Sequence, residues 1–224
     1  MAAVHDTWVV VPLFNEEPVI GDVVRGLLDV FPNVVCVDDG SSDQSAREAE
    51  AAGATTVRHA LNLGQGAALQ TGITYALADP AMEYVVTFDA DGQHQVSDAV
   101  HMVQRLRDDE ADVVFGSRFL DSRTRPGVLK RLVLKTAVVY SNATTGLHLT
   151  DAHNGLRALD RKVCEQIDIR QNRMAHASEL TQQIAKTGGR MVEQPVHILY
   201  TDYSRAKGQS LLNGVNILTD LLFK

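Results

Sequence analysis

Cysteine is scarce in this 224-residue chain, and its two residues, Cys36 and Cys164, lie far apart and form no CxxC pair. Their number and spacing argue against a disulfide framework or a structural zinc site. The N-terminal residues lack the basic and apolar segments of a signal peptide. No window approaches the run of about 18 apolar residues that a membrane-spanning helix needs. We therefore expect a protein of the reducing cytoplasm that does not itself cross a membrane.

An excess of basic residues is also missing. The chain has 21 Lys+Arg against 28 Asp+Glu, a net charge of −7, so we expect no nucleic-acid partner. It contains neither GxGxxG nor GxxxxGK[ST], which disfavours a dinucleotide cofactor and a P-loop. Hydrophobic residues make up 45% of the chain, and no repeat or linker interrupts it. A single domain over residues 1–224 is the expected organisation.

Apolar runs alternate with segments of helical periodicity through the first half of the chain. The alternation predicts a mostly parallel α/β sheet with helices on both faces. The predicted strands are residues 8–13, 34–37, 55–58, 84–88 and 112–115, with a later one at 190–200. The predicted helices are residues 17–31, a segment ending near 52, 64–77 and 96–107. Ligands in such folds bind beyond the carboxyl ends of the strands, where three polar clusters fall.

The cluster with the most specific pattern is residues 89–94 (DADGQH), directly after a predicted strand. Carboxylates at positions i and i+2 can both face one cation if the backbone bends at Ala90. Such hard oxygen ligands suit Mg²⁺ or Mn²⁺ shared with phosphate oxygens. The alternative is an Asp-Gly turn whose Asp caps the next helix.

The other clusters are Asn15-Glu16 and residues 38–43 (DDGSSD). A carboxylate at a strand end can accept hydrogen bonds from a base N–H or from ribose hydroxyls. A local turn is the alternative for the second cluster, with Gly40 at positive φ and Asp43 as a helix cap. Farther on, residues 118–135 hold six basic residues and one acidic residue, a candidate patch for an anionic partner or a solvated amphipathic helix.

Four ordered motifs together resemble family-2 glycosyltransferases, which have the GT-A nucleotide-diphospho-sugar transferase fold. The motifs are residues 12–16 (PLFNE), 37–43 (VDDGSSD), 62–66 (NLGQG) and 89–94. Downstream elements are similar to the dolichyl-phosphate-mannose-synthase-like branch, which includes bacterial polyprenyl-phosphate glycosyltransferases. These elements are residues 116–119 (GSRF), 150–158 (TDAHNGLRA) and 205–210 (RAKGQS).

The resemblance implies a role for each matched position. Asp89, Asp91 and Gln93 would hold Mg²⁺ or Mn²⁺. Donor binding would involve Pro12, Phe14, Asn15, Glu16, Asp39, Gly66, Asp89, Ala90 and Arg205. The acceptor phosphate would meet Arg118, Arg131 and Lys207, and the catalytic set would be Asp91, Asp151 and Arg118. Weaker candidates near the sugar are Arg157, His176 and Glu179.

The implied reaction is inverting transfer of a sugar from a nucleotide-diphosphate sugar to a polyprenyl phosphate, for cell-surface glycan or glycoconjugate synthesis. A phosphate acceptor is already an anion and needs no general base. Transfer to a sugar hydroxyl of a lipid-linked glycan is the first alternative, and it would need a base such as Asp151, His94 or His153. A non-catalytic nucleotide-sugar-binding subunit of a membrane partner is the second. The donor stays open among uracil, guanine and thymine nucleotides.

The resemblance also divides the chain and places it in the cell. Residues 8–120 form the nucleotide-sugar and metal half, residues 121–209 the acceptor half, and residues 210–224 a C-terminal amphipathic helix. Relatives often add transmembrane helices, which this sequence does not show. We expect a peripheral protein on the cytoplasmic face of the cell membrane. Residues 210–223 would dock on a small membrane-protein partner, pair in a homo-oligomer, or pack on their own core.

Overall fold

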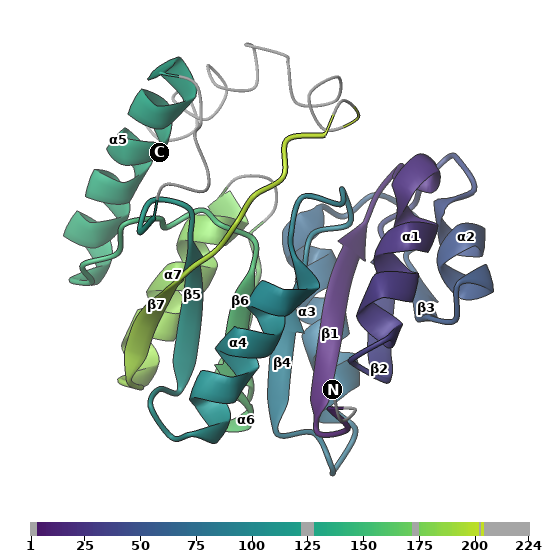
Figure 1. Ribbon diagram of the computed structural model, residues 1–224, viewed down its shortest axis with the longest axis horizontal. Helices are drawn as coiled ribbons and strands as arrows, with labels where there is room; N and C mark the ends of the chain where they lie inside the picture. Colours follow the sequence, from purple (N-terminus) through teal and green to yellow (C-terminus); the bar gives the residue numbers. More distant parts are fainter. Residues whose placement is uncertain (1–3, 122–127, 172–174, 202, 204–224) are drawn as a thin grey trace.

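Seven strands form one sheet in the computed structural model, which describes residues 4–121, 128–171, 175–201 and 203. The order across the sheet is β3-β2-β1-β4-β6-β5-β7 (Figure 1). The strands are β1 (Thr7–Leu13), β2 (Asn33–Asp38), β3 (Thr55–Arg58), β4 (Tyr84–Thr87), β5 (Val113–Ser117), β6 (Arg157–Asp160) and β7 (Met191–Pro195).

Every neighbouring pair of strands is parallel except the two pairs that β6 makes. β6 runs antiparallel between β4 and β5, with Arg157 opposite both Thr87 and Phe115. Its first residue therefore lies at the edge where β4 and β5 end. The predicted mostly parallel sheet is confirmed, and this reversed strand brings a later part of the chain to the same edge.

Helices cover both faces of the sheet, as predicted. They are α1 (Glu17–Leu28), α2 (Ser45–Ala51), α3 (Gln65–Leu77), α4 (Val96–Arg107), α5 (Val128–Thr145), α6 (Arg161–Cys164) and α7 (Ala175–Thr187). One core holds buried side chains of α1, α2 and α4. The other holds those of α3, α6 and α7. Residues of β1 alternate between the two, with Val9 and Val11 in the first core and Val10 in the second, as expected for a strand buried on both faces.

Two predicted elements are longer than the observed ones. Helix α1 has Pro18 in its first turn and buries Ile20, Val24 and Leu27 along one stripe, but it ends at Leu28 rather than Phe31. Pro32 follows Phe31 in the sequence and disfavours helical geometry in the residue before it. Phe31 still reaches the first core from the loop. Strand β7 ends at Pro195, whereas the sequence predicted it to continue to residue 200.

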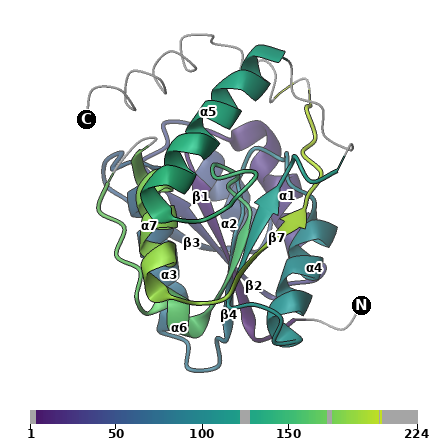
Figure 2. The same ribbon diagram turned by 90° about the vertical axis from the view of Figure 1, so that its left-hand side faces the viewer.

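Helix α5 lies beyond the β7 edge of the sheet and packs against α7 (Figure 2). Its first part overlaps the basic stretch at residues 118–135, and the exposed side chains of the helix include Lys135 and Val139. Arg131 lies near the start of α5, but its side chain is outside the described part. No helix within the described residues is long and apolar enough to span a membrane.

Candidate functional site

A cavity of about 380 Å³ opens at the carboxyl ends of β1, β2 and β4. Its wall comes from the loops after those strands, from the loop after β3 and from the start of α3. The lining residues are Pro12, Leu13, Phe14, Glu16, Asp39, Asn62, Gly64, Gln65, Ala68, Asp89, Ala90 and Asp91. Six of the residues expected to bind the donor are among them. Asn62 and Gln65 also line the cavity, although the sequence motifs assigned no role to either. Two other expected donor residues, Asn15 and Gly66, lie outside this lining.

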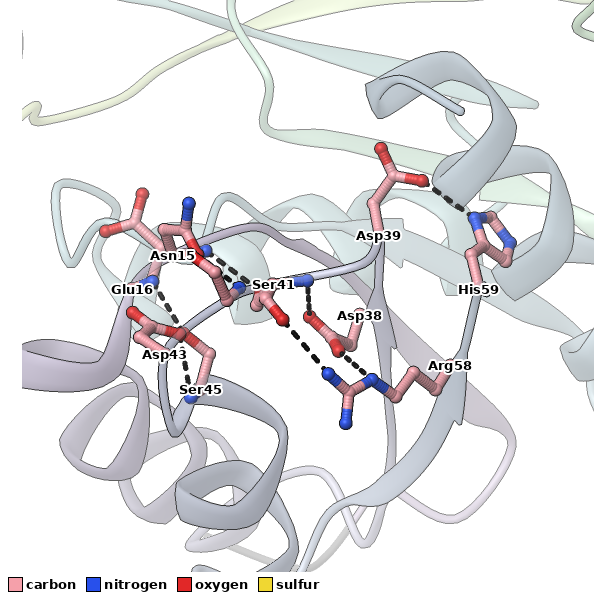
Figure 3. A network of polar contacts seen from close by, with 10 residues as sticks. Asn15, Glu16, Asp38, Asp39, Ser41, Asp43, Ser45, Arg58 and His59 are labelled. Atoms are coloured by element: carbon pink, nitrogen blue, oxygen red, sulfur yellow. Dashed lines mark hydrogen bonds and ion pairs between the residues drawn. The ribbon is translucent and has the colours of Figure 1, made fainter. Parts of the chain in front are cut away.

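The loop after β1 and the loop after β2 are joined by hydrogen bonds (Figure 3). Asn15 has a φ of 53°, and its backbone N–H donates to Ser41 Oγ at 2.9 Å. In return, the Ser42 N–H donates to Asn15 Oδ1 at 2.9 Å. The Glu16 N–H donates to Ser45 Oγ at 2.7 Å. Asn15 therefore joins the two loops through both its backbone and its side chain, and the neighbouring Phe14 lines the cavity.

Asp38 is fully buried and serves the loop itself. Its Oδ1 accepts from the Ser41 N–H at 3.1 Å, and its Oδ2 lies 3.0 Å from Arg58 Nε. Arg58 also donates to the Ser41 carbonyl at 3.0 Å. The Asp38 carboxylate thus fixes the turn that leads its neighbour, Asp39, towards the cavity.

Asp39 lines the cavity and holds the loop that follows β3. Its Oδ1 lies 2.8 Å from His59 Nδ1 and accepts from the Leu63 N–H at 2.8 Å. Its Oδ2 accepts from the Gly64 N–H at 2.7 Å. His59 Nε2 lies 3.0 Å from Thr71 Oγ1 on α3. The sequence singled out Asp39 but missed His59, although His59 directly follows a predicted strand, as Asp89 does.

Asp89 follows β4 and is bonded from two sides. Its Oδ2 lies 2.9 Å from His94 Nε2, and its Oδ1 accepts from Gln65 Nε2 at 3.3 Å. Burial works to raise the pKa of Asp89. The hydrogen bond and positive charge of His94, with the charges of Arg157 and Arg118, outweigh burial and hold that pKa below its usual value. Asp89 is therefore ionised at neutral pH.

Asp91 has the opposite shift. Burial, with the negative charge of Asp89, raises the pKa of Asp91 to about 6. Two carboxylates whose negative charges repel each other favour a bound cation, and their hard oxygens fit Mg²⁺ or Mn²⁺. No group of three or more His, Cys, Asp or Glu side chains within the described residues could hold a metal. A pair of carboxylates suits an ion that completes its shell with water and substrate phosphate. The expected third ligand, Gln93, lies outside the cavity lining.

Arg118 follows β5 and forms a buried ion pair with Asp151. Its Nε lies 2.5 Å from Asp151 Oδ2, which also accepts from the Arg118 N–H at 3.2 Å. The two residues are 9% and 1% exposed. The backbone N–H of Asp151 donates to Glu193 Oε1 at 3.1 Å. The sheet thus brings two of the three expected catalytic residues together, and Asp151 sets the direction of Arg118.

A second cavity of about 100 Å³ adjoins the first and shares Gln65 and Asp89 with it. Its other lining residues are Leu69, His153, Gly155, Arg157, His176 and Ala177. Burial lowers the pKa of Arg157 to about 10, although Asp89 and Asp151 act against it. Burial and the Arg157 charge lower the pKa of His153 to about 4, so His153 is neutral at pH 7.

Gly66 and Tyr203 join other segments to this site. A Cβ on Gly66 would lie 2.7 Å from His176 Cβ and would overlap the Gln171 carbonyl oxygen, so Gly66 permits close packing. Tyr203 Oη donates to Glu16 Oε2 at 2.7 Å. Burial and this bond raise the pKa of Tyr203. The expected Arg205, Lys207 and the 210–223 helix lie outside the described residues.

Comparison with known proteins agrees with this architecture. The family model "Glycosyl transferase family 2" matches residues 8–168. An uncharacterized protein of Methanocaldococcus jannaschii is 34% identical, over 98% of this chain and 92% of its own. The UDP-N-acetylglucosamine–dolichyl-phosphate N-acetylglucosaminyltransferase of Methanococcus voltae is 29% identical over 96% of this chain and 94% of its own.

Two further comparisons extend the agreement. An undecaprenyl-phosphate 4-deoxy-4-formamido-L-arabinose transferase of Enterobacter sp. is 29% identical, over 98% of this chain and 67% of its own. Among solved structures, glucosyl-3-phosphoglycerate synthase of Mycobacterium tuberculosis, in complex with Mg²⁺ and UDP, superposes with a TM-score of 0.70. That superposition has 18% identity and covers 96% of this chain and 79% of that one. The family match and the shared fold confirm the predicted GT-A architecture.

Proposed function

Because the chain belongs to glycosyl transferase family 2, and is therefore a glycosyltransferase, we propose that it moves a sugar from a nucleotide-diphosphate sugar to a polyprenyl phosphate with inversion. One observation carries the proposal. Asp39 after β2 and the Asp89–Asp91 pair after β4 line the same cavity. A nucleotide that binds along this wall meets a base-binding or ribose-binding carboxylate and a cation-binding pair. Relatives with lipid-phosphate acceptors in their names support the acceptor.

The donor half of the proposal follows from the cavity. Asp89 and Asp91 would hold Mg²⁺ or Mn²⁺, which when bound supplies a Lewis acid for the charge on the departing diphosphate. His94 and Gln65 orient the Asp89 carboxylate through their hydrogen bonds. Loss of either carboxylate would leave the ion with only one ligand from this pair, so we expect both carboxylates to be essential.

The acceptor half rests on Arg118. Its ion pair with Asp151 uses Nε, and no contact with another described residue occupies the terminal nitrogens, which could bind a phosphate as a guanidinium does well. Asp151 Oδ2 already accepts two bonds from Arg118. That oxygen is occupied, whereas Asp151 Oδ1 is buried and has no hydrogen-bond partner among the described residues. The proposal of a phosphate acceptor, which needs no base, is therefore supported by the Arg118 guanidinium rather than by the state of Asp151.

A polyprenyl-phosphate acceptor would place the reaction at a membrane surface. The basic stretch at residues 118–135 would then face anionic lipid, where each charge contributes about 1 kcal/mol. Within it, Lys135 on α5 is exposed. The roles of Arg131 and Lys207 at the acceptor phosphate, the location on the cytoplasmic face and the docking of residues 210–223 stay predictions.

The decisive experiment measures transfer from labelled UDP, dTDP and GDP sugars to polyprenyl phosphate in the presence of Mn²⁺. We expect an acid-labile glycolipid. Asp91→Asn should lower the rate by at least about a hundredfold, since the bound ion contributes several kcal/mol to the transition state. Asp108→Asn, an exposed carboxylate at the end of α4, is the matched control and should leave the rate unchanged.

Two other results would contradict the proposal. Transfer to a lipid-linked oligosaccharide without transfer to the lipid phosphate would show a hydroxyl acceptor. Nucleotide binding without transfer to either acceptor would favour a binding subunit. Wild-type activity in Asp91→Asn would remove this residue from the metal site.

A further inference from the structure

We propose that Asp39 and His59 make the donor site selective for bases with one isolated ring N–H, uracil and thymine, against guanine. The inference rests on the proposed function, because it concerns the base of the nucleotide donor. It is carried by the hydrogen bonds that the Asp39 carboxylate already accepts inside the protein.

Those bonds fill all but one of the acceptor positions of the Asp39 carboxylate. An ionised carboxylate has about four such positions, two on each oxygen. Oδ1 is fully used, since it accepts from His59 Nδ1 and from the Leu63 N–H, each at 2.8 Å. Oδ2 accepts from the Gly64 N–H at 2.7 Å. Among the residues that the structure describes, nothing else occupies Oδ2, so one position on it remains for a ligand.

His59 is the side chain that decides this count. An ionised carboxylate can only accept, so the hydrogen of this bond must be on His59 Nδ1. The ring is held on its other side by Thr71, whose Oγ1 lies 3.0 Å from Nε2. The His59 side chain is 11% exposed. The His59 ring is thus fixed between the end of β3 and α3. It keeps Asp39 Oδ1 occupied when a ligand binds in the cavity.

The remaining position distinguishes the bases by the donors on their pairing edges. Guanine presents a ring N–H and an adjacent amino group, which together bind both oxygens of a carboxylate; here Oδ1 has no position left. Uracil and thymine present a single N–H between two carbonyls and need one acceptor. Cytosine and adenine place a ring nitrogen lone pair at the same point of the edge, opposite an acceptor-only group.

The surroundings strengthen this selection. Asp39 is 3% exposed, so a ligand N–H that reaches Oδ2 replaces little water. A hydrogen bond to a buried charge contributes more than one to a neutral group. Phe14 lines the same cavity and is 43% exposed, which gives a flat base an apolar ring to contact.

The test is calorimetric titration of the full chain with UDP, dTDP, GDP, CDP and ADP in the presence of Mn²⁺. We expect UDP and dTDP to bind at least about tenfold more tightly than GDP, the effect of one hydrogen bond to a charged group. Equal or tighter binding of GDP overturns the inference and leaves the proposed function standing. If none of the five binds, both fail.

Two substitutions test the role of His59 as a positioning residue. His59→Asn places an amide N–H near the position of Nδ1 and should keep the preference for UDP over GDP. His59→Ala frees a position on Oδ1, and the UDP-to-GDP affinity ratio should fall by about fivefold or more. A merely structural role would weaken all nucleotides equally and leave that ratio unchanged, which would overturn the assignment. Circular dichroism checks folding; if His59→Ala does not fold, the wild-type series alone decides base selection.

Discussion

At the scale of single residues, Gly155 decides where the Asp89 carboxylate lies. A Cβ on Gly155 would overlap both carboxylate oxygens of Asp89, whose carboxylate supplies its three nearest atoms. This contact joins the loop before β6 to the loop after β4. The position of one proposed metal ligand therefore depends on a glycine more than sixty residues away in the chain.

We predict that Gly155→Ala lowers the transfer rate by at least about tenfold, because Asp89 must move away from the position that a bound ion requires. Steady-state kinetics at increasing Mn²⁺ concentrations would measure this change, and titration of bound Mn²⁺ by electron paramagnetic resonance would show whether affinity for the ion falls. Wild-type kinetics in this variant would mean that Asp89 adjusts without cost.

The sequence predicted the carboxylates of the site better than their partners. Asp39, Asp89 and Asp91 stand out because each follows a strand, and the structure brings all three to one cavity. His59 and Gln65 were missed as functional residues, because their roles depend on how close the loops come in space. For His59 a signal did exist, since it directly follows the strand at residues 55–58.

At the scale of elements, a glycine on α3 and one on α1 differ in how much space surrounds them. Gly72 on α3 lies directly over β1, where an added Cβ would overlap Val10 Cγ1. Gly26 on α1 has room, with Val96 Cγ2 at 3.9 Å from an added Cβ. Alanine substitutions at these two helical glycines therefore compare a crowded position with an open one.

We predict opposite effects for alanine at these two positions. Gly72→Ala should lower the free energy of unfolding by about 1–3 kcal/mol, because the core must shift to admit the methyl group. Gly26→Ala should raise it by up to about 1 kcal/mol, because alanine has the higher helix propensity. Urea denaturation of both variants gives the comparison, and equal effects would contradict the close approach of α3.

Elements with strong patterns were predicted well, and β6 was not. The helix at residues 96–107 and the strand at 55–58 have the predicted bounds, since their apolar patterns or flanking turns are clear. Residues 157–160 (RALD) are short and begin with a buried arginine, which gives no strand pattern. Pairing with β4 and β5 makes them a strand, and such long-range pairing is not visible in a local pattern.

At the scale of the whole molecule, each face of the sheet has its own core and its own cysteine. Cys36 on β2 lies in the core beneath α1, α2 and α4, and Cys164 on α6 lies in the other. Burial raises the pKa of the Cys36 thiol to about 12. Burial, with nearby Asp160 and Glu165, raises the pKa of Cys164 as well. Both thiols are therefore protonated and covered at neutral pH.

We predict that the native protein does not react with Ellman's reagent at about pH 8, because the thiolate is the reactive form, and that the guanidinium-unfolded chain releases two equivalents. Cys36→Ala and Cys164→Ala leave one thiol each, so each variant reports on one core. The two thiols should become reactive at the same denaturant concentration, because strands such as β1 contribute to both cores. Earlier reaction of one thiol would show that its core opens independently.

The antiparallel strand β6 also sets an order of events during synthesis of the chain. β5 leaves the ribosome about forty residues before β6, yet in the finished sheet β6 lies between β4 and β5. The emerging chain therefore cannot complete this sheet from one end to the other. Asp89 reaches its final environment only after Gly155 and Arg157 have been translated. A nascent chain that stops near residue 120 would carry the Asp89–Asp91 sequence without the strand that fixes it, so the ability to bind its ligand would arise late in translation.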